Sequence, residues 1–251
     1  MKKIFPLILL ALLCVLSCGG RKHISSITGG RIAVVSNVGR TPSPALLSVI
    51  EQGSRAVDSI RRPVLGEAAV PLVKAIPEST LMNFAADAIL SMARECTGEN
   101  VEIAVTNKGG LRSDIQAGVI TFGDVYNVFT FENKLALLTL SGENLLQLCR
   151  EIAAVGGEPI SGLSLVIKAD GTLVTALAGG EPIDVSRSYL VATSDYLSQG
   201  NDRMTALALA SECRVFDDIT IRDLVVRYIC AATAAGEKVS AECDGRITIQ
   251  E

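Results

Sequence analysis

The sequence is poor in histidine, and this limits the chemistry that the chain can perform. His23 is the only histidine among 251 residues, and it lies in a polar stretch close to the N-terminus. A two-metal hydrolytic centre needs several histidine and carboxylate ligands, and most serine hydrolases need a histidine base. The sequence offers neither set, and it contains no G-x-S-x-G motif. We therefore expect this chain to bind no metal or other cofactor and to catalyse no hydrolysis alone.

Basic clusters and paired cysteines are also missing. Lys and Arg number 23 against 27 Asp and Glu, and they are dispersed, so no nucleic-acid partner is expected. Beyond Cys14 and Cys18, five cysteines occur at irregular spacing without a C-x-x-C pair, a pattern that argues against a metal cage. In an exported protein one or two disulfides would be compatible with this count. The nearest candidates in sequence are Cys213, Cys230 and Cys243.

Long apolar runs are absent, except for a short one at the N-terminus. Residues 4–16 are apolar and follow Lys2 and Lys3, but the run is too short for a permanent transmembrane helix. Its end, Val15-Leu16-Ser17-Cys18, resembles a bacterial lipoprotein signal. We expect a signal peptide at 1–17, lipidation of Cys18 and a flexible tether at 18–30, with an ordinary secretory peptide as the alternative. The lipid would anchor the protein in the bacterial cell envelope, on the periplasmic or surface face of the outer membrane.

Apolar periodicity predicts interleaved helices and strands in the rest of the chain. We expect helices at 44–62, 78–96, 142–154 and 218–235, a short helix or turn at 122–128, and caps at Ser79 or Thr80 and at Ser141. Strands are expected at 31–35, 64–73, 101–106, 135–140, 189–193 and 246–249, with a hairpin of 163–168 and 173–177. This order predicts an α/β (α+β) fold in which helices pack a mixed sheet. Residues 31–76 would form a connector strand and helix region, and residues 77–251 the main domain.

A glycine-containing loop follows the predicted strand at 101–106. Its sequence is Asn107-Lys108-Gly109-Gly110-Leu111-Arg112. The glycines permit positive φ angles and close approach of the backbone, while Asn107 and Arg112 offer a carboxamide and a guanidinium to a polar ligand. The alternative is a tight turn in which Arg112 is solvated or paired with Asp114.

Six motifs, taken in order, resemble the C-terminal, substrate-binding domain of the 5′-nucleotidase family. They are Glu78-Ser79, the glycine loop, Gly118-Val119-Ile120-Thr121, Phe131-Glu132-Asn133, Leu140-Ser141-Gly142, and Tyr196-Leu197 with Gly200-Asn201-Asp202. Six motifs in the same order are far more specific than any one of them. The resemblance covers residues 78–202.

The resemblance implies a nucleoside site. Phe131 and Tyr196 would sandwich the base, and Asp202 would bind the ribose. The glycine loop would add Asn107, Gly109, Gly110 and Arg112 as polar contacts. Stacking between two rings tolerates many bases. The alternatives are that both rings pack in the core and that Asp202 caps the segment after it.

Asn83 and Asp87 match polar family positions on the helix predicted at 78–96. We interpret both as mainly structural, bracing the glycine loop, and the alternative is that they contact the ligand.

Three positions depart from the family pattern. The G-G-D-G-F ending becomes Gly200-Asn201-Asp202-Arg203-Met204. Asn201 would tolerate a left-handed backbone, and Arg203 would change the pocket rim. Thr130 replaces a usual proline, and Pro77 stands where some relatives have an arginine, which removes one cationic contact.

The resemblance implies a role in nucleotide catabolism. The chain would be the nucleotide- or nucleoside-binding half of a split 5′-nucleotidase. A separately encoded metallophosphoesterase subunit would hold the divalent metals and hydrolyse the phosphate ester. The alternative is a nucleoside-binding or scaffold lipoprotein without enzymatic activity.

Overall fold

The computed structural model describes residues 26, 28–30 and 43–250. The chain divides into two compact units, Met1–Leu47 and Ser48–Glu251, and the fold described below belongs to the second. The predicted signal peptide at 1–17, the lipidation site Cys18 and the predicted strand at 31–35 lie outside the described residues. In the described part of the chain, no helix is long and apolar enough to cross a membrane.

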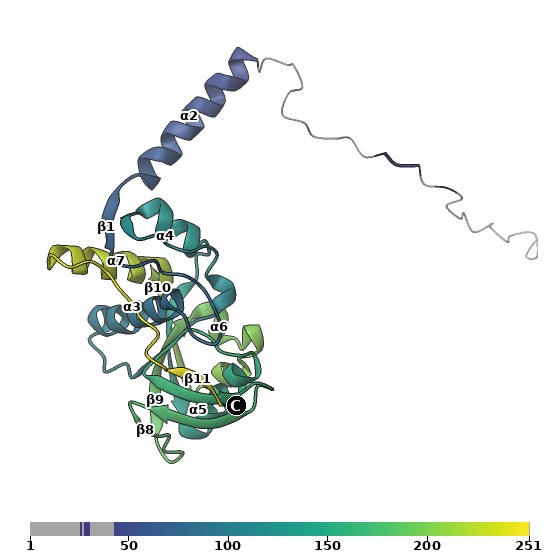
Figure 1. The fold of residues 1–251 in the computed structure, drawn as a ribbon, viewed down its shortest axis with the longest axis vertical. Helices are drawn as coiled ribbons and strands as arrows, with labels where there is room; N and C mark the ends of the chain where they lie inside the picture. Colours follow the sequence, from purple (N-terminus) through teal and green to yellow (C-terminus); the bar gives the residue numbers. More distant parts are fainter. Residues whose placement is uncertain (1–25, 27, 31–42, 251) are drawn as a thin grey trace, which may run out of the picture. The chain divides into compact units, whose positions relative to one another are not determined.

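A five-stranded mixed sheet forms the centre of the fold (Figure 1). Its strand order is β10 (Glu212–Thr220), β4 (Lys134–Ser141), β9 (Ser188–Ser194), β2 (Ile103–Val105) and β5 (Ile160–Ser161). Strands β2 and β9 are parallel, whereas the other neighbours are antiparallel. The predicted α/β fold with a mixed sheet and packing helices is thus confirmed.

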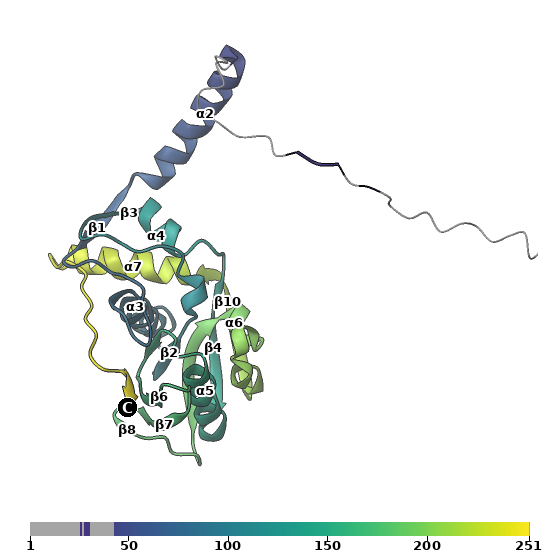
Figure 2. The ribbon, with the colours of Figure 1, turned by 45° about the vertical axis from the view of Figure 1, so that its right-hand side comes forward.

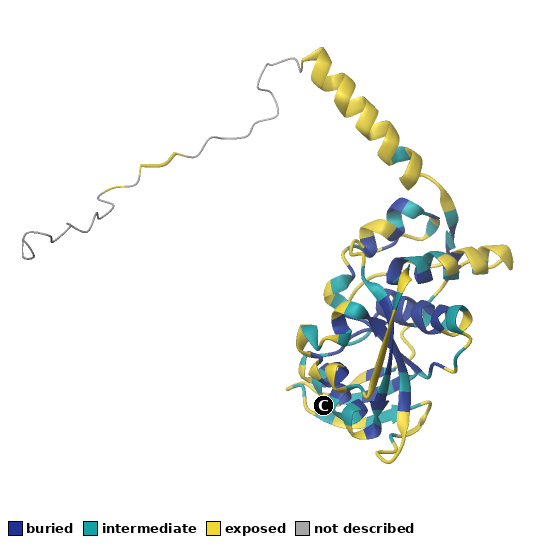
Figure 3. Ribbon diagram, turned by 180° about the vertical axis from the view of Figure 1, so that it is seen from behind, coloured by how far each residue is buried: buried dark blue, intermediate teal, exposed yellow. Residues whose placement is uncertain are grey.

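The central sheet has a hydrophobic core on each face. Along β4, Leu135 and Leu137 belong to one core, whereas Leu138 and Leu140 belong to the other, as the two-residue period of a strand requires. The first core includes the helices α3 (Thr80–Thr97) and α7 (Ile221–Ala234), and the second includes α5 (Gly142–Ala154). Figure 2 shows the strands between α3 and α5, and Figure 3 shows that the buried residues gather there.

Two smaller sheets complete the fold. The first has the order β11 (Ile247–Gln250), β6 (Leu163–Lys168), β7 (Leu173–Ala178) and β8 (Glu181–Pro182), and it contains the predicted hairpin β6–β7. Its strand β6 contributes Leu163, Leu165 and Ile167 to the core around α5. The second pairs β1 (Val64–Ala68) with β3 (Gly118–Thr121).

Side-chain caps fix where the helices begin. Ser79 and Ser141 accept hydrogen bonds from the backbone amides of residues 82 and 144, which confirms both predicted caps. The segment predicted as a short helix or turn is α4 (Phe122–Val128), and Thr121 begins it in a capping box with Asp124. The helix predicted at 44–62 is α2 (Pro44–Arg61).

One predicted boundary near the C-terminus was wrong. The helix predicted to begin at Asp218 begins at Ile221, because Thr220 forms a capping box with Asp223 and residues 218–220 complete β10. Strand β10 escaped prediction because most of its side chains are exposed and carry no clear alternation. Cys213, Cys230 and Cys243, the candidates for disulfides, are free thiols, as are Cys96 and Cys149.

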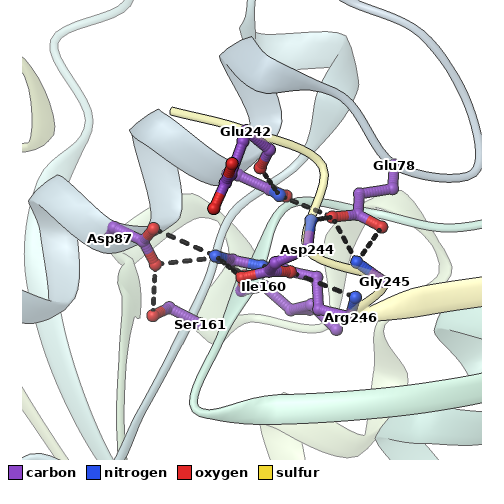
Figure 4. A network of polar contacts seen from close by, with 9 residues as sticks. Glu78, Asp87, Ile160, Ser161, Glu242, Asp244, Gly245 and Arg246 are labelled. Atoms are coloured by element: carbon purple, nitrogen blue, oxygen red, sulfur yellow. Dashed lines mark hydrogen bonds and ion pairs between the residues drawn. The ribbon is translucent and has the colours of Figure 1, made fainter. Parts of the chain in front are cut away.

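A network of polar side chains ties α3 to the C-terminal segment (Figure 4). The Arg246 guanidinium donates to both Asp87 carboxylate oxygens, at 2.8 and 3.1 Å, and to Asp244. Asn83 donates to Glu78 at 2.6 Å and to the Glu242 carbonyl oxygen at 2.8 Å. Asn83 and Asp87 are structural residues, as predicted, but they brace residues 242–246 and not the glycine loop.

Candidate functional site

Three chain segments that carry predicted site residues meet at one edge of the central sheet. Asn107 follows β2, and Tyr196 lies in the short helix α6 (Asp195–Ser198) that follows β9. Because β2 and β9 are parallel, their carboxyl ends reach the same edge. Strand β4 runs antiparallel to β9 and begins at this edge, where it is preceded by Phe131. The strand topology therefore brings together residues that are far apart in sequence.

A pocket of about 350 Å³ lies at this edge. Its lining residues are Asn107, Gly109, Phe131, Asn133, Tyr196 and Asp202, which include five of the seven predicted binding residues. Phe131 and Tyr196 are 51% and 40% exposed, so the alternative that these rings pack in the core is wrong. In the described part of the chain, neither ring is paired with another aromatic side chain. Each ring therefore leaves part of its surface exposed where it lines the pocket.

The Asp202 carboxylate connects two walls of this pocket. It accepts a hydrogen bond from the Asn107 carboxamide and another from the Tyr196 hydroxyl, the latter at 2.9 Å. The hydrogen bond to this carboxylate raises the pKa of Tyr196 above its ordinary range. Asp202 therefore does not serve as the cap of the segment after it. A carboxylate has about four lone-pair positions, so Asp202 can still accept hydrogen bonds from hydroxyl groups of a ligand.

The glycine loop lines the site, but its glycines do not use the positive φ angles that the sequence analysis considered. Lys108–Gly110 is one turn of 3₁₀ helix, and neither Gly109 nor Gly110 has a positive φ angle. Gly110 is needed for close approach, because a Cβ atom there would lie 2.7 Å from the Asn107 side-chain oxygen. At Gly109 a Cβ atom would make only ordinary contacts, at 3.6 Å or more. Gly110 itself lines a neighbouring cavity of about 20 Å³ that Phe131 also borders.

Arg112 is not among the residues that line the main pocket. Its side chain is exposed, and Nη1 donates to the Gly109 carbonyl oxygen at 3.3 Å. The alternative pairing with Asp114 does not occur, since Asp114 accepts a hydrogen bond from the Lys74 backbone amide at 2.9 Å. Arg112 thus stabilises the loop turn in this conformation.

Lys108 also turns away from the main pocket. Its ammonium group donates to the carbonyl oxygens of Val155 and Gly157, at 2.9 and 2.7 Å, and to the Glu158 carboxylate at 3.0 Å. Burial raises the pKa of the Glu158 carboxyl above its ordinary value, although the hydrogen bonds from Lys108 oppose this rise. The pair fixes the glycine loop to the segment after α5.

A buried arginine holds the segment that carries Phe131. Arg222, whose side chain is 8% exposed, donates to the Phe129 carbonyl oxygen at 3.0 Å and to the Glu132 carboxylate. Its guanidinium carbon also lies 4.6 Å from the centre of the Tyr126 ring. These contacts on either side of Phe131 restrict the position of its backbone.

Sequence reasoning missed three residues around the site. Asn133 lines the pocket, and its place two residues after Phe131 in a family motif was the available signal. Glu158, which holds the glycine loop, and Arg222, which holds the segment of Phe131, lie outside every motif. No signal in the sequence therefore pointed to either residue.

The residues gathered here offer aromatic surfaces and hydrogen-bonding groups to a ligand. Within residues 43–250, no group of three or more His, Cys, Asp or Glu side chains is placed to hold a metal ion. The pocket combines two exposed rings, two carboxamides and one carboxylate. Such a set can stack on a planar ring and accept hydrogen bonds from hydroxyl groups.

Comparison with known sequences finds relatives whose names describe nucleotide phosphoesterases and nucleotidases. The trifunctional nucleotide phosphoesterase protein YfkN of Bacillus subtilis is 29% identical over 185 residues, which cover 68% of this chain and 12% of that protein. The probable 5′-nucleotidase of Treponema pallidum is 28% identical over 170 residues, which cover 58% of this chain and 28% of the relative. The chain thus spans less than a third of the length of these curated relatives.

Comparison with solved structures shows the same fold. The 5′-nucleotidase precursor of Thermus thermophilus matches with a TM-score of 0.71 and 24% identity, over 82% of this chain and 43% of that structure. A putative 5′-nucleotidase of Staphylococcus aureus matches with a TM-score of 0.64 and 14% identity, over 87% of this chain and 46% of that structure.

A family model supplies the assignment. The model described as 5′-nucleotidase, C-terminal domain matches residues 64–209, which is more than half of the chain and includes every residue that lines the main pocket. The protein therefore belongs to the 5′-nucleotidase C-terminal domain family.

Proposed function

We propose that this protein is the nucleotide- or nucleoside-binding half of a split 5′-nucleotidase. The observation that carries the proposal is the pocket in which Phe131, Tyr196 and Asp202 meet. The two exposed rings would stack on the base, and each such contact stabilises a bound base by about 1–3 kcal/mol. Asp202 would accept hydrogen bonds from the ribose hydroxyl groups, while Asn107 keeps the carboxylate oriented.

The catalytic metals would come from a separately encoded metallophosphoesterase subunit. The names of several relatives describe phosphoesterases or nucleotidases, and this chain covers only part of their length. The partner would supply the divalent metals and the attacking water, and this chain would present the nucleotide with its phosphate toward the metals. Binding energy from the nucleoside would then lower the barrier at the distant phosphoryl group.

The proposal includes a location in the bacterial cell envelope. Lipidation of Cys18 would anchor the protein at the outer membrane, facing the periplasm or the surface, without a membrane-spanning helix. Nucleotides outside the cytoplasm would be its ligands, and nucleotide catabolism its pathway. Support for this location comes from the N-terminal sequence alone.

The experiment isolates the tagged, lipidated protein from its native membranes in a mild detergent. The eluate is assayed for phosphate release from AMP, with and without a chelator, and its subunits are identified. The proposal predicts chelator-sensitive release that accompanies a second protein and is lost in the Phe131→Ala/Tyr196→Ala variant.

Two results would contradict the proposal. Phosphate release by a single polypeptide would remove the need for a partner. Binding of AMP without release and without a co-purifying protein would favour a nucleoside-binding lipoprotein that has no enzymatic role.

A further inference from the structure

Arg203 carries a positive charge that no other described side chain neutralises. It is exposed, and among residues 43–250 no hydrogen bond or ion pair involves its guanidinium. By contrast, Arg222 is buried and Arg246 is partly buried, and both are paired with carboxylates. Exposed arginines are common on protein surfaces. The position of Arg203 relative to the pocket therefore decides whether its guanidinium can contact a ligand.

The backbone at Arg203 is held in an uncommon conformation. Asp202 and Arg203 have φ angles of 54° and 65°, so two consecutive residues with side chains occupy the left-handed region. That region is unfavourable for residues other than glycine, and such geometry persists only where surrounding contacts enforce it. Here the Asp202 carboxylate is bound by Asn107 and Tyr196, and the Asn201 side chain donates to the Tyr196 carbonyl oxygen at 2.7 Å. Arg203 is therefore presented by a fixed turn.

Arg203 lines a second pocket that adjoins the first. This open pocket of about 450 Å³ is lined by Lys108, Gly109, Val155, Glu158, Asp202 and Arg203. Gly109 and Asp202 belong to both pockets, so Asp202 stands where they meet. A ligand that contacts Asp202 from the first pocket can extend a substituent into the second.

The charges around the second pocket leave one cation open to a ligand. An ammonium group has three donors, and all three donors of Lys108 are used by two carbonyl oxygens and Glu158. Glu158 is neutralised by the same contact. Arg203 keeps its donors, and the planar guanidinium binds phosphate through two parallel hydrogen bonds.

The chemistry of Asp202 indicates which part of a nucleotide reaches Arg203. A carboxylate repels phosphate and accepts hydrogen bonds from hydroxyl groups. With the base between Phe131 and Tyr196, the hydroxyl groups within reach are those on the 2′ and 3′ carbons of the ribose. A phosphate on one of these two oxygens leaves the other hydroxyl to donate to Asp202, and the Arg203 guanidinium in the adjoining pocket would offset the repulsion between that phosphate and the Asp202 carboxylate.

We propose that Arg203 forms a subsite for a phosphate carried on the 2′ or 3′ oxygen of the ribose. The inference rests on the proposed nucleoside pocket, because it needs the base and ribose to be bound there. It makes Arg203 a specificity-determining residue and adds nucleotides phosphorylated on the hydroxyl side of the ribose to the ligand class.

The test compares the dissociation constants of adenosine, adenosine 3′-monophosphate and adenosine 5′-monophosphate. They are measured by calorimetry on the full lipidated protein in detergent. The 3′-monophosphate should bind about tenfold more tightly than adenosine, as expected for one charge-assisted contact at an exposed site. Arg203→Gly should abolish that gain and leave adenosine binding unchanged. Glycine suits the left-handed backbone, so this variant should fold.

Two further variants sharpen the test. Arg203→Lys keeps the charge but loses the paired hydrogen bonds, so it should retain part of the gain. Arg150→Ala removes another exposed arginine, outside both pockets, and should change nothing.

Three results would overturn the inference. In the first, the 3′-monophosphate and adenosine bind equally well. In the second, Arg203→Gly weakens the binding of the 5′-monophosphate as much as the binding of the 3′-monophosphate. In the third, no compound binds, and only this result would overturn the proposed nucleoside pocket as well.

Discussion

The Tyr196 hydroxyl donates a hydrogen bond of 2.9 Å to the Asp202 carboxylate, and both residues line the same pocket. This bond orients the tyrosine ring at the pocket wall. The carboxylate in turn is fixed by Asn107. The site is thus a connected unit in which each polar residue positions another.

The first prediction concerns the titration of Tyr196. Its pKa is raised because the charged Asp202 carboxylate favours the protonated hydroxyl that donates to it. Asp202→Asn removes the charge, so the pKa of Tyr196 should fall toward the ordinary value for tyrosine. Asparagine tolerates the left-handed backbone at this position. The measurement is an ultraviolet titration of tyrosinate, in which subtraction of the Tyr196→Phe variant isolates this residue. An unchanged pKa in Asp202→Asn would contradict the hydrogen bond.

The two loop glycines should respond differently to alanine. Gly110→Ala brings a Cβ atom to 2.7 Å from the Asn107 side-chain oxygen, so Asn107 must move and lose its contact with Asp202. We expect about 1–2 kcal/mol of lost stability, as for other overpacked sites, and weaker binding of nucleoside. Gly109→Ala makes ordinary contacts and should leave the free energy of unfolding within about 0.5 kcal/mol. Urea denaturation of both variants measures this, and equal losses would contradict the assigned close approach.

Arg222 should position the ring of Phe131 without touching ligand. Arg222→Lys keeps the charge but cannot reach the Phe129 carbonyl oxygen and Glu132 together, so the segment should loosen. We expect the dissociation constant for adenosine to rise about three- to tenfold, which corresponds to about 1 kcal/mol. The comparison variant is Arg55→Lys, which alters an exposed ion pair on α2 and should leave binding unchanged. If Arg222→Lys binds adenosine normally, the segment is held by other contacts.

The Arg246 network should contribute to stability and not to binding. Arg246→Met leaves Asp87 and Asp244 without their cation, but both carboxylates are more than a third exposed, so the free energy of unfolding should fall by about 1–2 kcal/mol. Arg55→Met, in which both partners of the ion pair are exposed, should change it little. Urea denaturation gives both values, and adenosine titration should be unaffected. A loss of binding in a folded Arg246→Met protein would contradict this separation.

The same network predicts a pH dependence. The hydrogen bond from Arg246 lowers the pKa of Asp244 in the folded protein. The contact between them therefore contributes fully to the free energy of unfolding above the ordinary pKa of aspartate, about 4. This contribution to stability is lost as the pH falls through the lowered pKa of Asp244, because Asp244 then becomes protonated in the folded protein as well. The stability difference between wild type and Arg246→Met should therefore narrow in acid.

Local signals in the sequence predicted the helices and several strands well. Ser79 and Ser141 predicted where their helices begin, because a capping hydrogen bond joins residues only three positions apart. The exposed edge strand β10 carried no such signal, since neither an apolar alternation nor a turn motif marks it. The start of α7 was misplaced because Ile219 continues the apolar pattern of the helix while it belongs to the strand.

The candidate site depended on order more than on local pattern. The motif order pointed to Phe131, Tyr196 and Asp202, and the antiparallel pairing of β4 with β9 explains why Phe131, which precedes β4, meets the two residues that follow β9. The Asn107–Asp202 contact joins residues far apart in the chain, and no periodicity predicts it. A left-handed backbone, which Asn201 would tolerate, occurs instead on either side of it, at Gly200 and at Asp202 and Arg203.

The most direct test of the account is a calorimetric titration of AMP into the full-length protein and into its Phe131→Ala/Tyr196→Ala variant. Leu209→Ala is the matched control, because Leu209 is 53% exposed and does not line the pocket. The account predicts binding by wild type and the control, and about a hundredfold weaker binding by the double variant, since each ring supplies roughly 1–3 kcal/mol of stacking. Equal affinity in all three proteins, or no binding by wild type, would contradict the claim that Phe131 and Tyr196 hold the base.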